Sequence, residues 1–322
     1  MPARAITRRR ALVILASTLA FPVMRAAAAE QTFEWRGTAL GADARLLLRA
    51  ESRQRAGEAI AACVAEIERL EQIFSLYRSS SELSGLNRDG KLASPSQDMV
   101  RLLHLSREMN RITGGLFDPT VQPLWELYAD WYAGDPAREA PPGEVVAEAR
   151  TRVGISKVRL ETAGGIACDP GTRLTLNGIA QGYITDRVAE LLRLRGWRHV
   201  LIDLGEVRAL DGRPDGGAWQ VGIREGGLTL PLSDAALATS SGDGLRLGHS
   251  GRITHIFNPL TGHSPSLWRS VTAGHASAAV ADALSTAALA AAPDHLARIV
   301  GAQDGVRIWA TRPDNTVAHY DS

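Results

Sequence analysis

The spacing of apolar and polar residues along the chain predicts where its helices and strands lie. Residues 32–50 alternate between polar and apolar and then become continuously apolar, which is typical of a half-buried strand. Over residues 60–74 the apolar side chains recur at three- and four-residue steps, which predicts a long amphipathic helix. A second helix is expected over residues 95–113, before two consecutive glycines, and a Gly- and Pro-rich stretch over 133–147 is expected to be a surface loop leading into a helix.

The second half of the chain is predicted to contain two further helices and several short strands. Asn177 is a suitable N-cap residue, and the helix after it is expected to run to Arg195 and end at Gly196. An alanine-rich helix is expected over 278–291. Strands are expected at 199–204, 219–224, 227–231, 236–239, 253–257 and 306–310. Because helices and strands come in blocks rather than in strict alternation, the expected fold class is α+β with largely antiparallel sheets.

The first 29 residues have the composition of an export signal. Three arginines follow Thr7, a largely apolar run covers residues 11–23, and three alanines precede Glu30. The apolar run is too short to span ~30 Å of hydrocarbon as a helix, and the alanines suit a signal-peptidase site. Consecutive arginines favour the twin-arginine route, with a Sec-type signal as the alternative. We therefore expect a signal peptide over 1–29 and a single periplasmic domain over 30–322, without a transmembrane segment.

Composition limits the class of protein. The chain has 322 residues, of which 45% are hydrophobic and 22% charged, as in a folded globular protein. Its formal charge is +1, but residues 1–29 hold five arginines and no acidic residue, so the remainder has 31 basic and 35 acidic side chains. A net charge of −4 argues against a broad nucleic-acid-binding surface, which needs clustered Lys and Arg.

Two polar groups are candidates for chemistry. The run of Ser240, Ser241 and Gly242 beside Asp243 superficially resembles a nucleophile turn, but polar residues in an ordinary turn explain it better. Asp282 and Thr286 are four residues apart on a predicted helix, so both project from one side of it. A carboxylate and a hydroxyl suit Mg²⁺, which takes oxygen ligands and is completed by substrate phosphates. The alternative is that the aspartate only stabilises the start of its helix.

Two glycine-containing segments have the composition of ligand-binding loops. In the segment 114–128, consecutive glycines allow close approach to a ligand, and Phe117 and Trp125 offer aromatic faces. In the segment 175–186, glycines open a helix whose N-terminal amides suit a pyrophosphate. Each pattern by itself also occurs in ordinary helix-to-loop transitions.

Taken in order, these segments resemble the ApbE-type FAD:protein FMN transferases, flavin-trafficking proteins of the bacterial periplasm. The resemblance covers nearly the whole mature chain and implies an ApbE-like α+β architecture related to the T-fold. The matching stretches are RGT at 36–38, FSLYRSSSELSGLN at 74–87, GLFDPTVQPL at 115–124, TLNGIAQGYITD at 175–186, ATSSG at 238–242, HIFNPLTG at 255–262 and ADALSTA at 281–287.

The resemblance also implies an activity and a set of site residues. Members of this family bind FAD with Mg²⁺ at its pyrophosphate and transfer the FMN half to a threonine hydroxyl of a target protein, releasing AMP. The metal ligands implied are Asp282, Thr286 and the backbone carbonyl of Gly178. The positions expected along FAD are Arg36, Tyr77, Leu116, Phe117, Asp118, Thr175, Gln181 and Ile256.

One histidine and three departures from the family pattern bear on catalysis. His255 is the candidate for accepting the proton of the acceptor hydroxyl, because imidazole titrates near neutral pH; a structural role in its turn is the alternative. Thr175 stands where the family has Asp, Gln181 where it has Lys, and Asn258 where it has Asp. Neutral side chains still hydrogen-bond a ribose or an adenine, but the lack of a carboxylate at 258 weakens a two-metal mechanism.

Three functions remain open from the sequence. The first is FMN transfer to a threonine-containing acceptor domain of a membrane-associated redox protein, such as a subunit of a sodium-pumping or Rnf-type complex or a membrane regulator of nitrous-oxide respiration. The second is Mg²⁺-dependent hydrolysis of FAD to FMN and AMP. The third is non-catalytic, a periplasmic FAD carrier or maturation scaffold.

Overall fold

The structure of the protein is a computed structural model. It describes residues 31–322, apart from 162–163, 224–225, 250 and 252. The predicted signal peptide over 1–29 therefore lies outside the described residues. Within the described part, no helix is both long and apolar enough to cross a bilayer.

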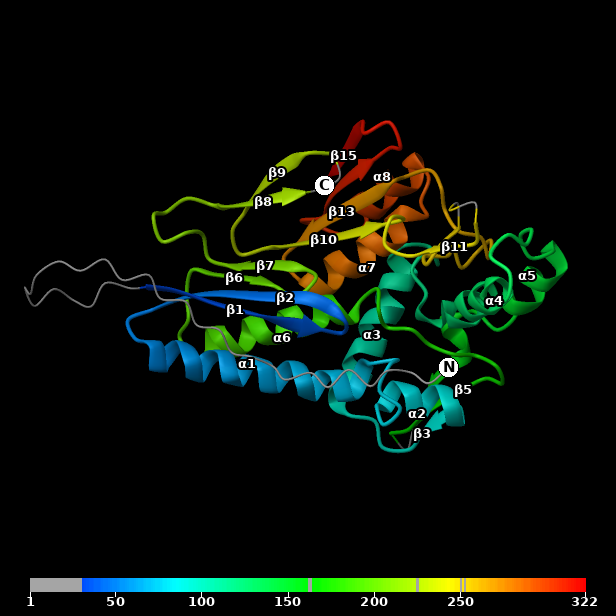
Figure 1. The fold of residues 1–322 in the computed structure, drawn as a ribbon, viewed down its shortest axis with the longest axis horizontal. Helices are drawn as coiled ribbons and strands as arrows, with labels where there is room; N and C mark the ends of the chain where they lie inside the picture. Colours follow the sequence, from blue (N-terminus) through cyan, green and yellow to red (C-terminus); the bar gives the residue numbers. More distant parts are fainter. Residues whose placement is uncertain (1–30, 162–163, 224–225, 250, 252) are drawn as a thin grey trace, which may run out of the picture.

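An eight-stranded sheet forms the centre of the described part of the chain (Figure 1). Its neighbouring strands all pair antiparallel. The predicted α+β class with antiparallel sheets is therefore confirmed. In order across the sheet the strands are β1 (Gln31–Ala39), β2 (Ala42–Ala50), β6 (Val200–Asp203), β7 (Val207–Leu210), β10 (Ala236–Ser241), β13 (Ser270–His275), β14 (Arg307–Thr311) and β15 (Val317–Asp321).

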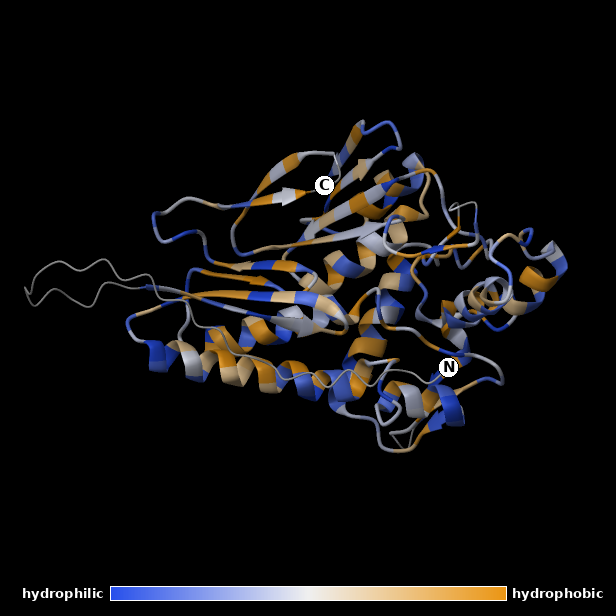
Figure 2. Cartoon of the chain, in the orientation of Figure 1, coloured by the Kyte–Doolittle hydropathy of each residue, from blue (hydrophilic) through white to orange (hydrophobic). Residues whose placement is uncertain are grey.

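Helices cover one face of this sheet and a hairpin covers part of the other. The helices on the first face contribute to one large apolar cluster, and hydrophobic residues line both the strands and these helices (Figure 2). They are α1 (Arg53–Phe74), α6 (Ala180–Leu194), α7 (Ala278–Leu289) and α8 (Pro293–Gly301). The hairpin is formed by β8 (Trp219–Ile223) and β9 (Leu228–Leu232), and it packs over a smaller cluster that includes Leu237 of β10.

The segment between α1 and α6 forms a second group of elements at one end of the sheet (Figure 1). A second apolar cluster, with Tyr128 stacked on Phe257, lies among them. The elements are α2 (Glu82–Asp89), β3 (Lys91–Leu92), α3 (Gln97–Ile112), the 3₁₀ helix Pro119–Val121, α4 (Gln122–Ala133), α5 (Gly143–Arg150), the 3₁₀ helix Ile155–Lys157, β4 (Val158–Leu160) and β5 (Ile166–Cys168). The short hairpin of β11 (Arg246–Leu247) and β12 (Ile253–Thr254) packs beside α4.

Several predicted elements differ in detail from the observed ones. Residues 32–50 form two strands rather than one, because Leu40 and Gly41 adopt positive φ angles of 45° and 89° and turn the chain back. The N-cap of α6 is Ile179 and not Asn177. The backbone amide of Asn177 donates a hydrogen bond to the Thr175 hydroxyl at 3.3 Å. The strand expected over 253–257 is confined to its first two residues.

The close contact between α6 and α7 predicts a stability difference between two glycine variants. A Cβ added at Gly182 would lie 2.2 Å from the carbonyl oxygen of Ala278, which is backbone and can move only if the helices separate. We expect Gly182→Ala to lower the free energy of unfolding by about 2 kcal/mol or more, as overpacking does. The control is Gly57→Ala on α1, where a Cβ meets no atom within 4 Å. The free energy of unfolding of that variant, measured by urea denaturation, should be about 0.5–1 kcal/mol higher than that of wild type, because alanine is more stable than glycine inside a helix. Equal stability of Gly182→Ala and wild type would show that the helices are not in this contact.

Candidate active site

The three predicted metal ligands lie together where α7 faces the start of α6. The Asp282 carboxylate accepts a hydrogen bond from the backbone amide of Gly182 at 3.0 Å. A Cβ added at Gly178 would lie 2.9 Å from the Thr286 hydroxyl oxygen, so the absence of a side chain at Gly178 leaves room for that hydroxyl. The four-residue spacing thus places Asp282 and Thr286 on the same side of α7, both facing the first turn of α6. Their role as metal ligands stays a prediction.

Asp282 is a buried acid. Only 3% of its surface is exposed. Burial raises its pKa from an ordinary 3.8 to about 7, the Gly182 amide opposes this rise, and the negative charge of Asp186 adds to it. An ionised carboxylate in such a place needs a compensating positive charge, which either a proton or a cation can supply.

Glu206 is a second buried acid at this site, and the sequence analysis missed it. It lies in the turn between β6 and β7 and is 6% exposed. Its carboxylate accepts a hydrogen bond from the backbone amide of Thr239, and burial and the nearby charge of Asp282 raise its pKa well above 4.5. The only sign in the sequence is a Gly–Glu pair directly after a buried strand, which is a common composition for a turn.

Ser240 lies beside Thr286. It is on strand β10, so the expectation that it belongs to a polar turn is wrong. Its hydroxyl oxygen is 2.8 Å from that of Ser285 and 3.2 Å from that of Thr286. This side chain therefore orients the hydroxyls of α7, and the resemblance to a nucleophile turn has no structural basis.

Asp186, the last residue of the central glycine-containing segment, fixes the start of α7. Its carboxylate accepts hydrogen bonds from the backbone amides of Ala278 and Ala279, at 2.9 and 3.1 Å, and from the Ser277 hydroxyl at 2.6 Å. Arg208 of β7 pairs with the same carboxylate at 2.6 Å. A carboxylate that satisfies helix N-terminal amides holds α7, and hence Asp282, in place against α6.

Three of the positions expected along FAD form one buried loop. Leu116, Phe117 and Asp118 are all buried. The Asp118 carboxylate accepts hydrogen bonds from the backbone amides of Thr120 and Ile155, both at 2.9 Å. Burial raises the pKa of Asp118, and these hydrogen bonds oppose the rise. The side chain of Asp118 thus holds the loop itself, and the Phe117 carbonyl accepts a hydrogen bond from the Asn110 side chain at 2.7 Å.

The other expected FAD positions are more accessible. Thr175 connects the buried loop to the segment before α6, because its amide donates to the Pro119 carbonyl at 2.7 Å. Gln181 lies against the turn that carries Glu206, since its amide nitrogen is 2.7 Å from a Cβ added at Gly205. Ile256 is half-buried.

Arg36 and Tyr77 lie further out. Arg36 is on β1 at the edge of the sheet and bonds to Glu34 at 2.5 Å. Three strands separate β1 from β10, which carries Ser240. Tyr77 follows α1 and is 78% exposed. The structure therefore gathers Gly178, Gln181, Asp282 and Thr286 closely, and leaves these two positions at the surface around them.

His255 follows the short strand β12. Its Nδ1 atom is 3.4 Å from both the amide nitrogen and the carbonyl oxygen of Leu245. Burial lowers its pKa below the ordinary 6.5, and the contact with Leu245 opposes this. The imidazole is therefore neutral near pH 7 and able to accept a proton. The preceding Thr254 lies 3.0 Å from a Cβ added at Gly242, which places the segment that carries His255 beside the turn that follows β10.

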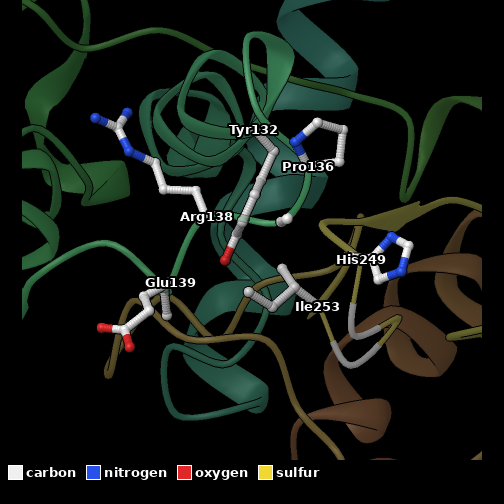
Figure 3. Close-up of a pocket in the computed structure, with 8 residues that line it drawn as sticks. Tyr132, Pro136, Arg138, Glu139, His249 and Ile253 are labelled. Atoms are coloured by element: carbon white, nitrogen blue, oxygen red, sulfur yellow. The ribbon is translucent and has the colours of Figure 1, made fainter.

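Two cavities lie elsewhere on the molecule. One has a volume of about 300 Å³ and is lined by Tyr132, Arg138, His249 and their neighbours (Figure 3). The other has about 250 Å³ and is lined by residues that include Arg49, His199 and Trp219. Neither includes any of the predicted site residues. The site at the α6–α7 contact is therefore recognised from its converging polar groups and not from either of these two cavities.

The fold and this geometry define an α+β protein that brings a carboxylate and hydroxyl groups together where two helices meet. The family model of the ApbE family matches residues 40–309. The chain belongs to the ApbE family.

Known relatives agree with this assignment. The chain is 29% identical over 206 residues to the FAD:protein FMN transferase of Haemophilus influenzae, and 29% identical over 210 residues to that of Vibrio cholerae. These matches cover 59% and 61% of this chain, but only 59% and 62% of the two relatives. The crystal structure of the ApbE protein from Thermotoga maritima superposes with a TM-score of 0.80 at 24% identity, over 90% of this chain and 97% of that one. At that identity the likeness establishes the fold.

The raised pKa of Asp282 predicts a pH dependence of stability. A carboxyl whose pKa is raised on folding contributes most stability when protonated, so its contribution is lost as pH rises from about 4 to about 7. We expect wild type to lose stability relative to Asp282→Asn across that range, by at least about 1.4 kcal/mol, and the difference to level off above pH 7. Urea denaturation of both proteins in EDTA measures it. A difference that is constant from pH 4 to 7.5 would contradict the buried, uncompensated carboxylate.

Proposed function

We propose that this protein is an FAD:protein FMN transferase that moves the FMN half of FAD to a threonine hydroxyl of another protein. The observation that carries the proposal is the convergence of Asp282 and Thr286 on α7 with the glycine-opened start of α6. Membership of the ApbE family and the names of the curated relatives support the same activity.

The residues at this point fit a magnesium ion. A carboxylate, a hydroxyl and the backbone at the start of a helix face one another here. Oxygen atoms are the ligands that Mg²⁺ prefers, and helix N-terminal amides bind phosphate. Gly178 leaves the space at Thr286 that a side chain would fill. Asp282, Thr286 and the Gly178 carbonyl would hold the ion. When bound, it supplies positive charge for the oxygens of the pyrophosphate.

The protein's own residues account for the remaining steps. The threonine oxygen of the acceptor bonds to the phosphorus of the FMN half, the bond from that phosphorus to the bridging oxygen breaks, and AMP leaves with that oxygen. His255 accepts the proton of the threonine hydroxyl, which its neutral imidazole is able to do. The amides of Ala180 and Gly182 donate to Leu176 and Asp282, so the Gln181 amide in the first turn of α6 is the one that stabilises the negative charge developing on the phosphate oxygens.

The departures from the family pattern are compatible with this activity. The Asn258 side chain accepts a hydrogen bond from the amide of Leu260 at 2.9 Å, and its backbone amide donates to His263 at 2.9 Å, so Asn258 maintains its turn. Gln181 and Thr175 are half-buried and polar, and both offer hydrogen bonds to a neutral part of the ligand.

The setting of the reaction belongs to the same proposal. The arginines and alanines of residues 1–29 support export by the twin-arginine route, and the domain would then act in the periplasm as one unit over 30–322. The acceptor would be a threonine-containing domain of a membrane-associated redox protein.

A mass measurement tests the transfer. The mature protein is incubated with FAD, Mg²⁺ and a candidate acceptor domain, and the intact mass of the acceptor is recorded. We expect FMN to be added by wild type and by Asp294→Asn, which alters an exposed acid at the start of α8. Asp282→Asn should slow the addition on the order of 100-fold or more, as loss of one group that stabilises developing charge does.

The other outcomes separate the competing functions. Free FMN without a modified acceptor would indicate hydrolysis of FAD. Turnover by Asp282→Asn at the wild-type rate would remove Asp282 from the reaction, and FAD binding without any turnover would indicate a carrier.

The proposed role of His255 predicts a pH profile. Because its pKa lies below 6.5, the transfer rate of wild type should rise with pH up to about that value and then stay level. His255→Asn should be slower by about 100-fold and should lose this rise, while FAD binding remains. A variant that keeps both the wild-type rate and its pH profile would leave His255 with a structural role alone.

A further inference from the structure

Glu206 has one carboxylate oxygen for which the described residues provide no partner. The side chain is 6% exposed. Its carboxylate accepts from the amide of Thr239, yet its Oε2 atom is buried and has no hydrogen-bond partner in the described part of the structure. Buried polar atoms are nearly always hydrogen-bonded, so an orphaned carboxylate oxygen indicates that a partner is missing.

The neighbours of Glu206 place that oxygen at the candidate active site. Thr239, which donates to the Glu206 carboxylate, directly precedes Ser240, whose hydroxyl contacts that of Thr286. Gly205, which precedes Glu206, contacts Gln181 in the first turn of α6. The next residue of α6, Gly182, donates to Asp282. The turn between β6 and β7 therefore approaches the α6–α7 contact from the side of the sheet.

Two acids buried near each other cannot both be charged without a counter-charge. The negative charges of Glu206 and Asp282 act on each other. A cation between them removes the repulsion and also gives the Glu206 oxygen its missing partner. In the FAD-free protein, one carboxylate and one hydroxyl leave a divalent ion with excess positive charge, which a second carboxylate balances.

We infer that Glu206 is a further ligand of the divalent cation held by Asp282 and Thr286. This inference rests on the proposed function for the presence of the cation, and it adds a residue from a different element, the β6–β7 turn. Glu206 thereby ties the sheet to the two helices through the ion, and loading the site with metal stiffens their junction.

Metal affinity tests this inference without any turnover. FAD-free mature protein is titrated with Mn²⁺, and free Mn²⁺ is followed by electron paramagnetic resonance. We expect Glu206→Gln to weaken Mn²⁺ binding at least tenfold. The control Glu144→Gln alters an exposed glutamate in the first turn of α5 and should bind as wild type does. Thermal unfolding in EDTA should show Glu206→Gln to be no less stable than wild type, because it replaces a buried acid by a neutral amide of similar shape.

The outcomes distinguish failure of the inference from failure of the proposed function. Unchanged Mn²⁺ affinity in Glu206→Gln, with normal binding by wild type, would overturn the inference alone. Absence of Mn²⁺ binding by wild type would contradict both. If Glu206→Gln does not fold, wild-type crystals soaked in Mn²⁺ decide the question. An anomalous peak within about 2.0–2.6 Å of a Glu206 carboxylate oxygen supports the inference, and a peak bonded to Asp282 and Thr286 but not to Glu206 refutes it.

Discussion

The structure depends on the close approach of α6 and α7. Gly182 allows it, because any side chain there would meet the Ala278 carbonyl, and its amide binds Asp282. Asp186, one turn further along α6, holds the first amides of α7 and so fixes the angle between the helices. The same contact that packs the helices therefore also presents a carboxylate and a hydroxyl to the amides at the start of α6. Gly182 and Asp186 therefore both pack the two helices together and position Asp282.

Charge is the second constraint at this junction. Asp282 and Glu206 are both buried, and burial raises the pKa of each. Such acids destabilise a protein unless a proton or a cation compensates them, so they are retained where a ligand uses them. The Ser240 hydroxyl contacts those of Ser285 and Thr286, and so links β10 to α7 beside Asp282.

Sequence patterns predicted most of the helices, because helices such as α1 and α3 carry apolar faces at helical spacing. The order of the predicted helices and strands also gave the correct fold class. The hairpin of β1 and β2 was missed because its turn at Leu40 and Gly41 interrupts no apolar pattern. Asp282 and Thr286 were found because four residues on one helix are visible in the sequence. Glu206 was not found and Ser240 was assigned to a turn, because their proximity to α7 arises from strand order and from burial, neither of which a local pattern contains.

In the proposed function, the α6–α7 junction binds a cation and the pyrophosphate of FAD together. Binding of two ligands at one site is reciprocal, so Mg²⁺ must raise the affinity for FAD if both share it. Calorimetric titration of FAD into the mature protein, with Mg²⁺ and with EDTA, measures this for wild type and for Thr286→Val, which removes the hydroxyl at similar size. We predict that Mg²⁺ tightens FAD binding by about tenfold or more in wild type, equivalent to about 1.4 kcal/mol, and has little effect in Thr286→Val. FAD binding that is equally tight with and without Mg²⁺ in wild type would contradict it.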